Sequence, residues 1–230
     1  MLRYGSIVLN GLGALVVVSG IWKSASWVNL NMLTTASMSE YGANTGAYAV
    51  ITGASDGLGK ALAHEGAKRG FNLVLISRSQ DKLVRVAEDI QSKHPVKVLI
   101  IACDCSKSIQ SNVASIQKQC TDLPVRVLWN NVGVNTGDSA ALEDISPSDL
   151  ESIVNTNCLF TISLTSAMIP LMKRQVALQE GKAAIANVSS FLSVLPAAHY
   201  VAYSASKGFI NQFSRALHCE LEESGIIVSN

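Results

Sequence analysis

Short apolar runs alternate with helix-spaced segments along this chain from residue 47 to its last residue. Each run is rich in Val, Ile, Leu and Ala and is followed by glycine or by small polar residues. Continuous apolar runs of this kind are typical of strands that are buried on both faces of a parallel sheet. The expected strands are Ala47–Thr52, Phe71–Ile76, Val96–Ala102, Val125–Asn130, Ala183–Val188 and Ile226–Ser229.

The segments between these runs place apolar residues at helical spacing. The expected helices are Gly57–Arg69, Gln80–Lys93, Ile109–Cys120, Leu150–Lys173 and Tyr203–Glu223. Regular alternation of strand and helix predicts an α/β fold, a Rossmann-like doubly wound parallel sheet with helices on both faces. Because the sequence stops inside the sixth expected strand, we expect this fold to be C-terminally truncated.

The first 46 residues differ from the rest of the chain in charge. Arg3 and Lys23 enclose 19 uncharged residues, within which Ile7–Trp22 reads IVLNGLGALVVVSGIW. A helix of about 20 apolar residues spans a bilayer. We therefore expect two parts, an N-terminal hydrophobic membrane-anchor segment with its linker at residues 1–46 and a globular domain at residues 47–230.

Three alternatives remain open for the apolar segment. It can be a cleaved signal peptide, with Ser24-Ala25-Ser26 as the small-residue cleavage site. It can lie at the membrane interface or form a hairpin, because Asn10, Gly11 and Gly13 interrupt it. It can also be a buried helix of the globular part.

Composition excludes several classes of partner and cofactor. With 18 basic and 17 acidic residues the net charge is +1, so electrostatics predict no nucleic-acid binding. The four histidines match no metal-ligand spacing, and no metal site is expected. Five irregularly spaced cysteines are not the pattern of a disulfide framework and indicate reduced thiols in the cytosol.

The first expected strand runs into a glycine-rich turn, Thr52-Gly-Ala-Ser-Asp-Gly-Leu-Gly59, and then into a helix. Glycine lets the backbone approach a pyrophosphate closely, and the helix N-terminus offers unpaired amides and a partial positive charge. The turn therefore indicates a dinucleotide site. Its spacing, Gly-x3-Gly-x-Gly, differs from the G-x-G-x-x-G fingerprint.

Two charged residues follow the next two expected strands. Arg78 comes just after the second strand, where a carboxylate would bind the ribose 2′-hydroxyl and an arginine instead accommodates a 2′-phosphate. Arg78 therefore favours NADP(H) over NAD(H), although a solvated surface arginine is the alternative. Asp104 follows the third strand and can either meet the adenine ring or cap its own turn through Ser106.

Ser190, Tyr203 and Lys207 form the constellation that carries chemistry. Tyr203 and Lys207 lie four residues apart at the start of an expected helix and share one face of it. A free tyrosine has a pKa near ~10, and a neighbouring ammonium favours its phenolate, which suits acid–base chemistry near neutral pH. Ser190 ends the preceding strand, where its hydroxyl can hydrogen-bond a substrate carbonyl.

Jointly, the glycine turn, Asn130-Asn131-Val132-Gly133, Ser190 and Tyr203-x3-Lys207 resemble the short-chain dehydrogenase/reductase family from Ala47 to the C-terminus. The resemblance implies that Tyr203 is the general acid during reduction, that Ser190 polarises the carbonyl, and that Lys207 assists Tyr203 and holds the nicotinamide ribose. It places Asn157 in a water-mediated proton relay and Asn131 beside the cofactor ribose, although Val132 replaces the more usual alanine. The turn residues it assigns to the cofactor phosphates are Gly53, Ser55, Asp56, Gly57, Leu58 and Gly59.

A narrower resemblance links the stretches YGANTGAY, ITGASDGLG and KRGFNLVLISR to the very-long-chain 3-oxoacyl-CoA reductases, which are related to a hydroxysteroid dehydrogenase type. It implies NADPH-dependent reduction of the 3-keto group of a long acyl-CoA in fatty-acid elongation. It also implies an endoplasmic-reticulum membrane anchor, a catalytic domain facing the cytosol, and a homodimer or partners of an elongation complex.

Two alternative functions stay open. The same scaffold can serve a hydroxysteroid or other lipid-alcohol dehydrogenase, and the loops that distinguish these substrates lie mainly beyond Asn230 in the family. The chain can also be a truncated, non-catalytic protein that binds nucleotide or a partner. Because family members continue past this point, we expect the chain as given to show little or no turnover.

Overall fold

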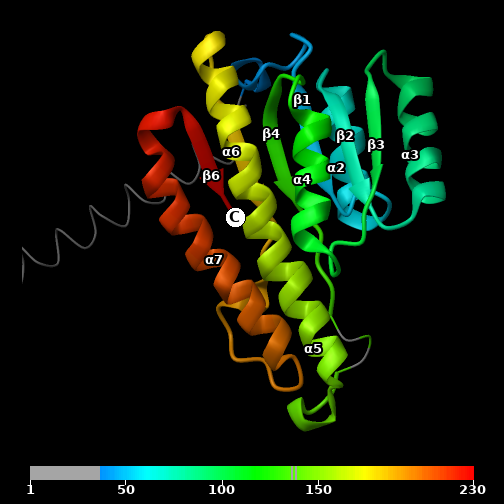
Figure 1. The fold of residues 1–230 in the computed structure, drawn as a ribbon, viewed down its shortest axis with the longest axis vertical. Coiled ribbons are helices and arrows are strands. Elements are labelled where there is room, and N and C mark those ends of the chain that lie inside the picture. The colour runs from blue at the N-terminus through cyan, green and yellow to red at the C-terminus, as the bar shows by residue number, and fades with distance from the viewer. Residues whose placement is uncertain (1–36, 136, 138) are drawn as a thin grey trace, which may run out of the picture. The chain divides into compact units, whose positions relative to one another are not determined.

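Six strands form one sheet in the order β3-β2-β1-β4-β5-β6, and every neighbouring pair is parallel (Figure 1). The computed structural model describes residues 37–135, 137 and 139–230. The predicted apolar segment Ile7–Trp22 lies outside the described residues. The strands are β1 (Tyr48–Thr52), β2 (Asn72–Ser77), β3 (Val98–Ala102), β4 (Val125–Asn130), β5 (Ala183–Asn187) and β6 (Ile226–Ser229). The predicted parallel sheet is therefore confirmed.

Helices connect successive strands and cover both faces of the sheet (Figure 1). The α-helices are α2 (Gly57–Lys68), α3 (Gln80–Lys93), α4 (Ile109–Cys120), α5 (Pro147–Val154), α6 (Thr161–Leu178) and α7 (Val201–Leu221). Short 3-10 turns occur at η2 (Met38–Tyr41), η3 (Leu142–Asp144), η5 (Phe191–Ser193) and η6 (Glu222–Ser224). A π-helical turn, η4 (Asn155–Phe160), joins α5 to α6.

The alternation of side chains along the strands builds two hydrophobic cores. In β1, Ala49 and Ile51 face one core, which packs the sheet against α2 and α3. Val50 faces the other, which contains residues of α4, α6 and α7. All three side chains are fully buried. Burial on both faces explains why these strands read as continuous apolar runs.

The long helix predicted at Leu150–Lys173 is interrupted, and this prediction was wrong in detail. α5 begins at Pro147, directly after Ser146, whose hydroxyl accepts a hydrogen bond from the Asp149 amide. At Asn155 the helix changes to π geometry, and regular α-helix begins again with α6. Single π turns inside α-helices often occur at functional sites. Hydrophobic periodicity continues through such a turn, so the pattern predicts helix without showing the break.

The helical stretch 147–178 is the one helix in the described part of the chain that is long and apolar enough to cross a membrane. Its apolar side chains nevertheless pack inside the domain: Phe160, Leu164 and Met168 are fully buried in the core. The helix also contacts α4 and β4. We therefore assign it as a core helix of the domain.

The residues just before β1 are held against the segment that leads into β5. η2 is fixed by Glu40, whose carboxylate pairs with Lys182 Nζ at 2.9 Å and whose carbonyl accepts from the Lys182 amide at 2.7 Å. Arg126, which is 2% exposed, donates to the carbonyls of Gln179 and Lys182, each at 3.1 Å. The compact unit therefore begins at Met38, ahead of the first strand.

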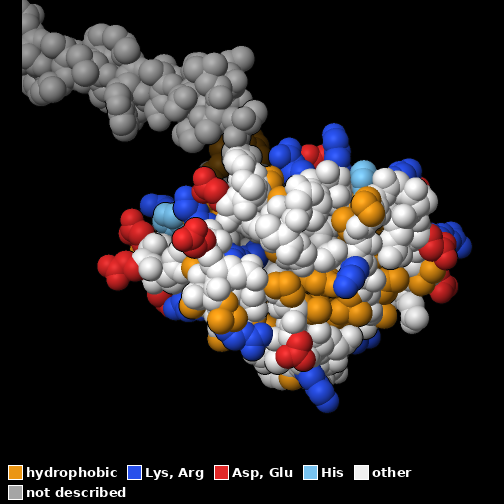
Figure 2. Space-filling view, turned by 90° about the horizontal axis from the view of Figure 1, so that it is seen from above, with side chains coloured by type: hydrophobic (Ala, Val, Ile, Leu, Met, Phe, Trp, Pro, Cys, Tyr) orange, Lys and Arg blue, Asp and Glu red, His pale blue; other side chains and the backbone are white. Residues whose placement is uncertain are grey.

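The two ends of the sheet differ in character. The end at which the strands begin carries a band of apolar side chains bordered by charged ones (Figure 2). The carboxyl ends of the strands lie at the opposite end, and the predicted site residues follow them. In open parallel sheets this is the end at which ligands bind.

Candidate active site

Two adjoining cavities lie at the carboxyl ends of the strands. One, of about 490 Å³, is lined by the glycine turn, Arg78 and Asp104. The other, of about 530 Å³, is lined by Ser190, Tyr203 and Lys207. Asn131, Gly133 and Val134 line both cavities. The two cavities therefore adjoin along the loop after β4, and together they are called the cleft below.

The glycine turn admits no side chain at its closest approach to β4. Gly53 has φ of +67°, a conformation that L side chains rarely adopt. A Cβ atom at Gly59 would overlap the Gly53 carbonyl oxygen and lie 2.5 Å from Asn131 Nδ2. Asn131 itself donates to the Thr52 carbonyl at 3.0 Å. The turn and the loop after β4 are thus packed together, which leaves backbone rather than side chains at the cavity wall.

Polar side chains of the turn are held by neighbouring elements. Asp56 caps α2 by accepting from the Gly57 amide at 2.9 Å, and Lys82 of α3 contacts its other oxygen at 3.1 Å. These two contacts, the backbone hydrogen bond first, lower the pKa of the Asp56 carboxyl. Ser55 Oγ and Ser77 Oγ are 2.7 Å apart, which joins the turn to the end of β2. Gly53, Ser55, Asp56 and Gly57 line the first cavity, Leu58 lines the second, and Gly59 lines neither. Phosphate binding by the turn stays a prediction.

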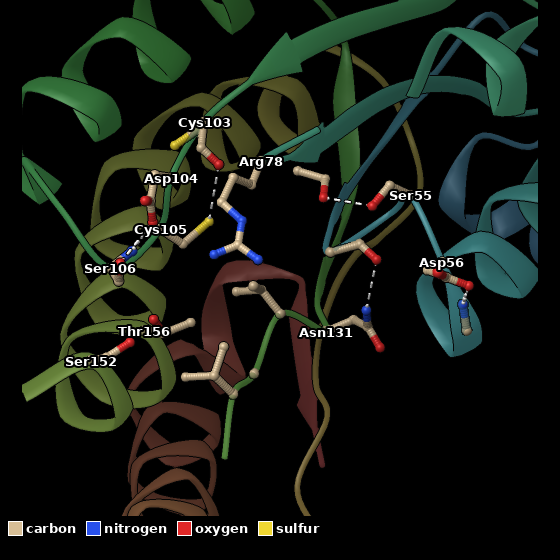
Figure 3. A pocket seen from close by; sticks show the side chains of 16 residues that line it. Ser55, Asp56, Arg78, Cys103, Asp104, Cys105, Ser106, Asn131, Ser152 and Thr156 are labelled. Atoms are coloured by element: carbon tan, nitrogen blue, oxygen red, sulfur yellow. Dashed lines mark hydrogen bonds between the residues drawn. The ribbon is translucent and has the colours of Figure 1, made fainter. Parts of the chain in front are cut away.

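Arg78 and Asp104 come from the ends of β2 and β3 and meet at the same end of the cleft (Figure 3). Among the described residues Arg78 forms no salt bridge, and its side chain lies in the cavity. Asp104 accepts from the hydroxyl and the amide of Ser106 at 2.7 and 3.0 Å, and the hydroxyl contact is the main cause of its lowered pKa. Asp104 therefore caps its own turn and also lines the cavity.

Lys207 is a buried ammonium at the other end of the cleft. Its side chain is 4% exposed, and Nζ donates to the Val188 carbonyl at 2.8 Å. Nζ lies 5.8 Å from the centre of the Tyr203 ring, one helical turn earlier on α7. Burial lowers the pKa of Lys207. The predicted pairing of Tyr203 with Lys207 on one helix face is thus present in the fold, although α7 begins at Val201 rather than at Tyr203.

Ser190 and Tyr203 line the same cavity from different elements. Ser190 ends the segment after β5, where its Oγ accepts from the Leu192 amide at 3.2 Å and caps η5. A hydroxyl that accepts this bond keeps its own hydrogen for a further acceptor. The serine can therefore donate to a group held in the cavity.

Asn157 lies within η4, and its side chain is fully engaged. Oδ1 accepts from the Val134 amide at 2.8 Å, while Nδ2 donates to the Val134 carbonyl at 2.9 Å and to Ser206 Oγ at 3.0 Å. Asn157 therefore ties the loop after β4 to α7 beside Lys207. Sequence reasoning missed Val134 and Ser206 because neither belongs to a spaced motif.

A buried polar network joins two strands to two helices inside the domain. Asn130 Nδ2 donates to Thr165 Oγ1 and to Asn187 Oδ1, both at 2.8 Å. Asn187 Nδ2 donates in turn to Ser214 Oγ at 2.9 Å. These bonds connect the ends of β4 and β5 to α6 and α7 inside the domain, and none of the four residues lines either cavity.

Comparison with known proteins agrees with this geometry. The family model for the short chain dehydrogenases matches residues 47–230. The chain belongs to the short-chain dehydrogenase family. A very-long-chain 3-oxoacyl-CoA reductase of Kluyveromyces lactis is 37% identical over 201 residues, which are 87% of this chain and 58% of that protein. One from Scheffersomyces stipitis is 35% identical over 236 aligned positions, 98% of this chain and 67% of that protein.

Among solved structures of the short-chain dehydrogenase family, one from Sphingobium yanoikuyae in complex with NADPH superposes with a TM-score of 0.72. It is 26% identical, and the match covers 80% of this chain and 69% of that chain. The resemblance inferred from the sequence motifs is thus confirmed at the level of the family. The chain spans little more than half the length of the Kluyveromyces relative.

Proposed function

We propose that this protein is an NADP(H)-dependent carbonyl reductase. The observation that supports this most strongly is that the two cavities of the cleft adjoin along the loop after β4. Arg78 and the glycine turn lie at one end, and Ser190, Tyr203 and Lys207 lie at the other. An extended dinucleotide with an anionic adenosine half and a reactive nicotinamide half matches a cleft arranged in this way.

The residues present fit such a dinucleotide. Gly53 lines the first cavity without a side chain, so the backbone of the turn can approach phosphate closely, and α2 begins at Gly57 within the same turn. Arg78 forms no salt bridge among the described residues and suits the 2′-phosphate that distinguishes NADP from NAD. When bound, NADPH would supply the hydride that reduces a carbonyl carbon.

The protein's own groups then manage the developing charge on the carbonyl oxygen. Ser190 Oγ donates a hydrogen bond to that oxygen and fixes its position. Tyr203 delivers its phenolic proton to the same oxygen as hydride arrives, so that an alcohol rather than an alkoxide leaves. Lys207, held at the Val188 carbonyl, places a positive charge beside the Tyr203 ring.

We further propose that the substrate is a long-chain or very-long-chain 3-oxoacyl-CoA in fatty-acid elongation. Two relatives that span most of this chain bear the name very-long-chain 3-oxoacyl-CoA reductase. The loop after Ser190 is uncharged and apolar, with Phe191 74% exposed and Val194 67% exposed. Such a surface beside the cleft suits an acyl chain better than a polar substrate.

We also propose that the apolar segment at Ile7–Trp22 anchors the protein to the endoplasmic-reticulum membrane, with the domain on the cytosolic side. Its length without charge supports this assignment. Flotation of the chain with vesicles, compared with a chain that starts at Ser37, measures it directly. Equal flotation of both chains would contradict the proposal. The homodimer and the partners of an elongation complex stay predictions.

The cofactor assignment is tested by titrating the purified chain, in detergent, with NADPH and with NADH while following nicotinamide fluorescence. We expect tighter binding of NADPH and a loss of about ten- to a hundredfold in Arg78→Ala, the range for a hydrogen bond to a charged group. Arg85→Ala removes an exposed arginine of α3 and is the matched control. Equal affinity for the two cofactors, or equal behaviour of the two variants, would refute the assignment.

The chemistry is tested in single turnovers with the protein in excess over a long-chain 3-oxoacyl-CoA, so that slow rates remain measurable. We expect Tyr203→Phe to lower the rate by at least about a hundredfold while NADPH affinity stays unchanged. Tyr48→Phe, at the start of β1, is the matched control. A 3-ketosteroid in place of the acyl-CoA tests the substrate class: faster reduction of the steroid would contradict the acyl-CoA proposal.

A further inference from the structure

Thr156 carries a buried hydroxyl that nothing in the described part of the chain satisfies. Its residue is 2% exposed, and Oγ1 forms no hydrogen bond to any described residue. Buried polar side-chain atoms in native folds are nearly always paired, and an exception commonly marks the place of a ligand, ion or water. Thr156 is also the second residue of the π turn η4, where the regular helical bonding pattern is broken.

This threonine lies at the nucleotide end of the cleft. It lines the first cavity together with Ser152, one turn earlier, and Figure 3 shows both side chains at the same wall. The neighbouring Asn155 donates to the Ser106 carbonyl at 3.2 Å. That bond fixes the wall carrying Thr156 against the loop that carries Asp104. A group bound against Asp104 therefore lies within reach of Thr156.

The hydroxyl itself is enclosed, so it must turn to reach a ligand. Threonine in a helix populates two χ1 rotamers, and rotation from one to the other carries the hydroxyl to a different staggered position. The side chain already lines the cavity, so one rotation about the Cα–Cβ bond moves the hydroxyl within the same wall. Since Oγ1 is unpaired in the present rotamer, this rotation breaks no hydrogen bond of the hydroxyl to a described residue.

We propose that Thr156 is a binding residue for the adenosine part of the dinucleotide, with Oγ1 hydrogen-bonded to the base or its ribose. The inference rests on the proposed nucleotide function and adds a residue that the sequence motifs do not include. Adenine and ribose present both donors and acceptors, and a hydroxyl can serve either. The hydroxyl pairs only when nucleotide is bound, which contributes to affinity and not to the stability of the free protein.

The test uses Thr156→Val, which removes the hydroxyl and keeps the shape, and Thr156→Ser, which keeps the hydroxyl. The probes are NADPH, adenosine 2′,5′-bisphosphate, which lacks the nicotinamide, and reduced nicotinamide mononucleotide, which lacks the adenosine. Thr165→Val is the matched control, because Thr165 Oγ1 is buried and accepts from Asn130. Thermal unfolding of each free protein is measured alongside.

We expect Thr156→Val to weaken the binding of NADPH and of the bisphosphate by the same factor, about three- to tenfold, and to leave the binding of the mononucleotide unchanged. The free Thr156→Val protein keeps or slightly raises its Tm, since an unpaired hydroxyl is replaced by a methyl. Thr165→Val shows the opposite pattern, a lower Tm and unchanged affinity. Thr156→Ser keeps the hydroxyl and binds NADPH within twofold of wild type. It is the variant measured if Thr156→Val fails to fold.

Two results would overturn the inference while leaving the proposed function intact. One is wild-type affinity of Thr156→Val for the bisphosphate. The other is a loss of affinity that is equal for all three probes, which would indicate a general distortion of the cleft. If the wild-type chain binds neither NADPH nor the bisphosphate, the proposed function is wrong and the role of Thr156 falls with it.

Discussion

Replacing Gly59 by alanine tests how closely the glycine turn is packed against the loop after β4. The added methyl would lie 2.5 Å from Asn131 Nδ2 and 2.8 Å from the Gly53 carbonyl carbon, whereas ordinary contacts begin at about 3.4 Å. The turn must therefore move by roughly 1 Å. A shift of this size breaks the 3.0 Å bond from Asn131 to the Thr52 carbonyl.

Overpacking of this kind costs about 1–3 kcal/mol. We expect Gly59→Ala to lower Tm by several degrees and to weaken NADPH by at least about tenfold, measured by thermal unfolding and fluorescence titration. Gly46→Ala is the control: Gly46 lies outside the cleft and has φ of +89° and nothing within 4 Å of an added Cβ. It therefore suffers backbone strain of about 1–2 kcal/mol without a clash. If both variants bind NADPH equally well, close packing at Gly59 is not what shapes the site.

Two further predictions concern buried cations. Because burial lowers the pKa of Lys207 in the folded state, the unfolded chain binds more protons between that lowered pKa and the ordinary value of 10.5. The unfolding free energy of wild type, measured relative to Lys207→Met, should therefore rise with pH across that window; a flat or falling difference would contradict it. Arg126→Met should lower the unfolding free energy by about 2–5 kcal/mol, because two carbonyls beside η2 lose their donors. These carbonyls lie far from the cleft, so NADPH affinity should not change. A changed NADPH affinity would contradict the inference that Arg126 acts on stability alone.

The strands could be predicted from the sequence because burial on both faces leaves them continuously apolar. α3 and α4 also begin and end where periodicity and polar boundaries predict. The break at η4 could not be predicted, since a π turn inserts into the helix without changing the apolar face that Phe160 and Leu164 present to the core. Packing against neighbouring elements, rather than local propensity, determines where such a turn lies.

The candidate site was predictable where chemistry needs a fixed spacing. Tyr203 and Lys207 must share a helix face, which fixes their spacing at four residues. The turn from Gly53 to Gly59 must exclude side chains at its close contacts, which requires glycine at fixed positions. Thr156 leaves none: a threonine is common in helices, and only the three-dimensional fold shows that its hydroxyl is unpaired at the cavity wall. Arg126 is similar, because its burial depends on carbonyls more than 50 residues away.

The contact between Glu40 and Lys182 has a consequence for biosynthesis. The two residues are 142 positions apart in the chain, and both their charged groups and their backbones are joined. At a synthesis rate of about 5–20 residues per second, roughly 7–28 seconds pass between the translation of the first partner and the second. Throughout that interval Glu40 lacks its partner, although Asn44 and Ala47 can already pair with Gly70 and Asn72. A chaperone or targeting factor that recognises nascent chains therefore has several seconds of access to η2.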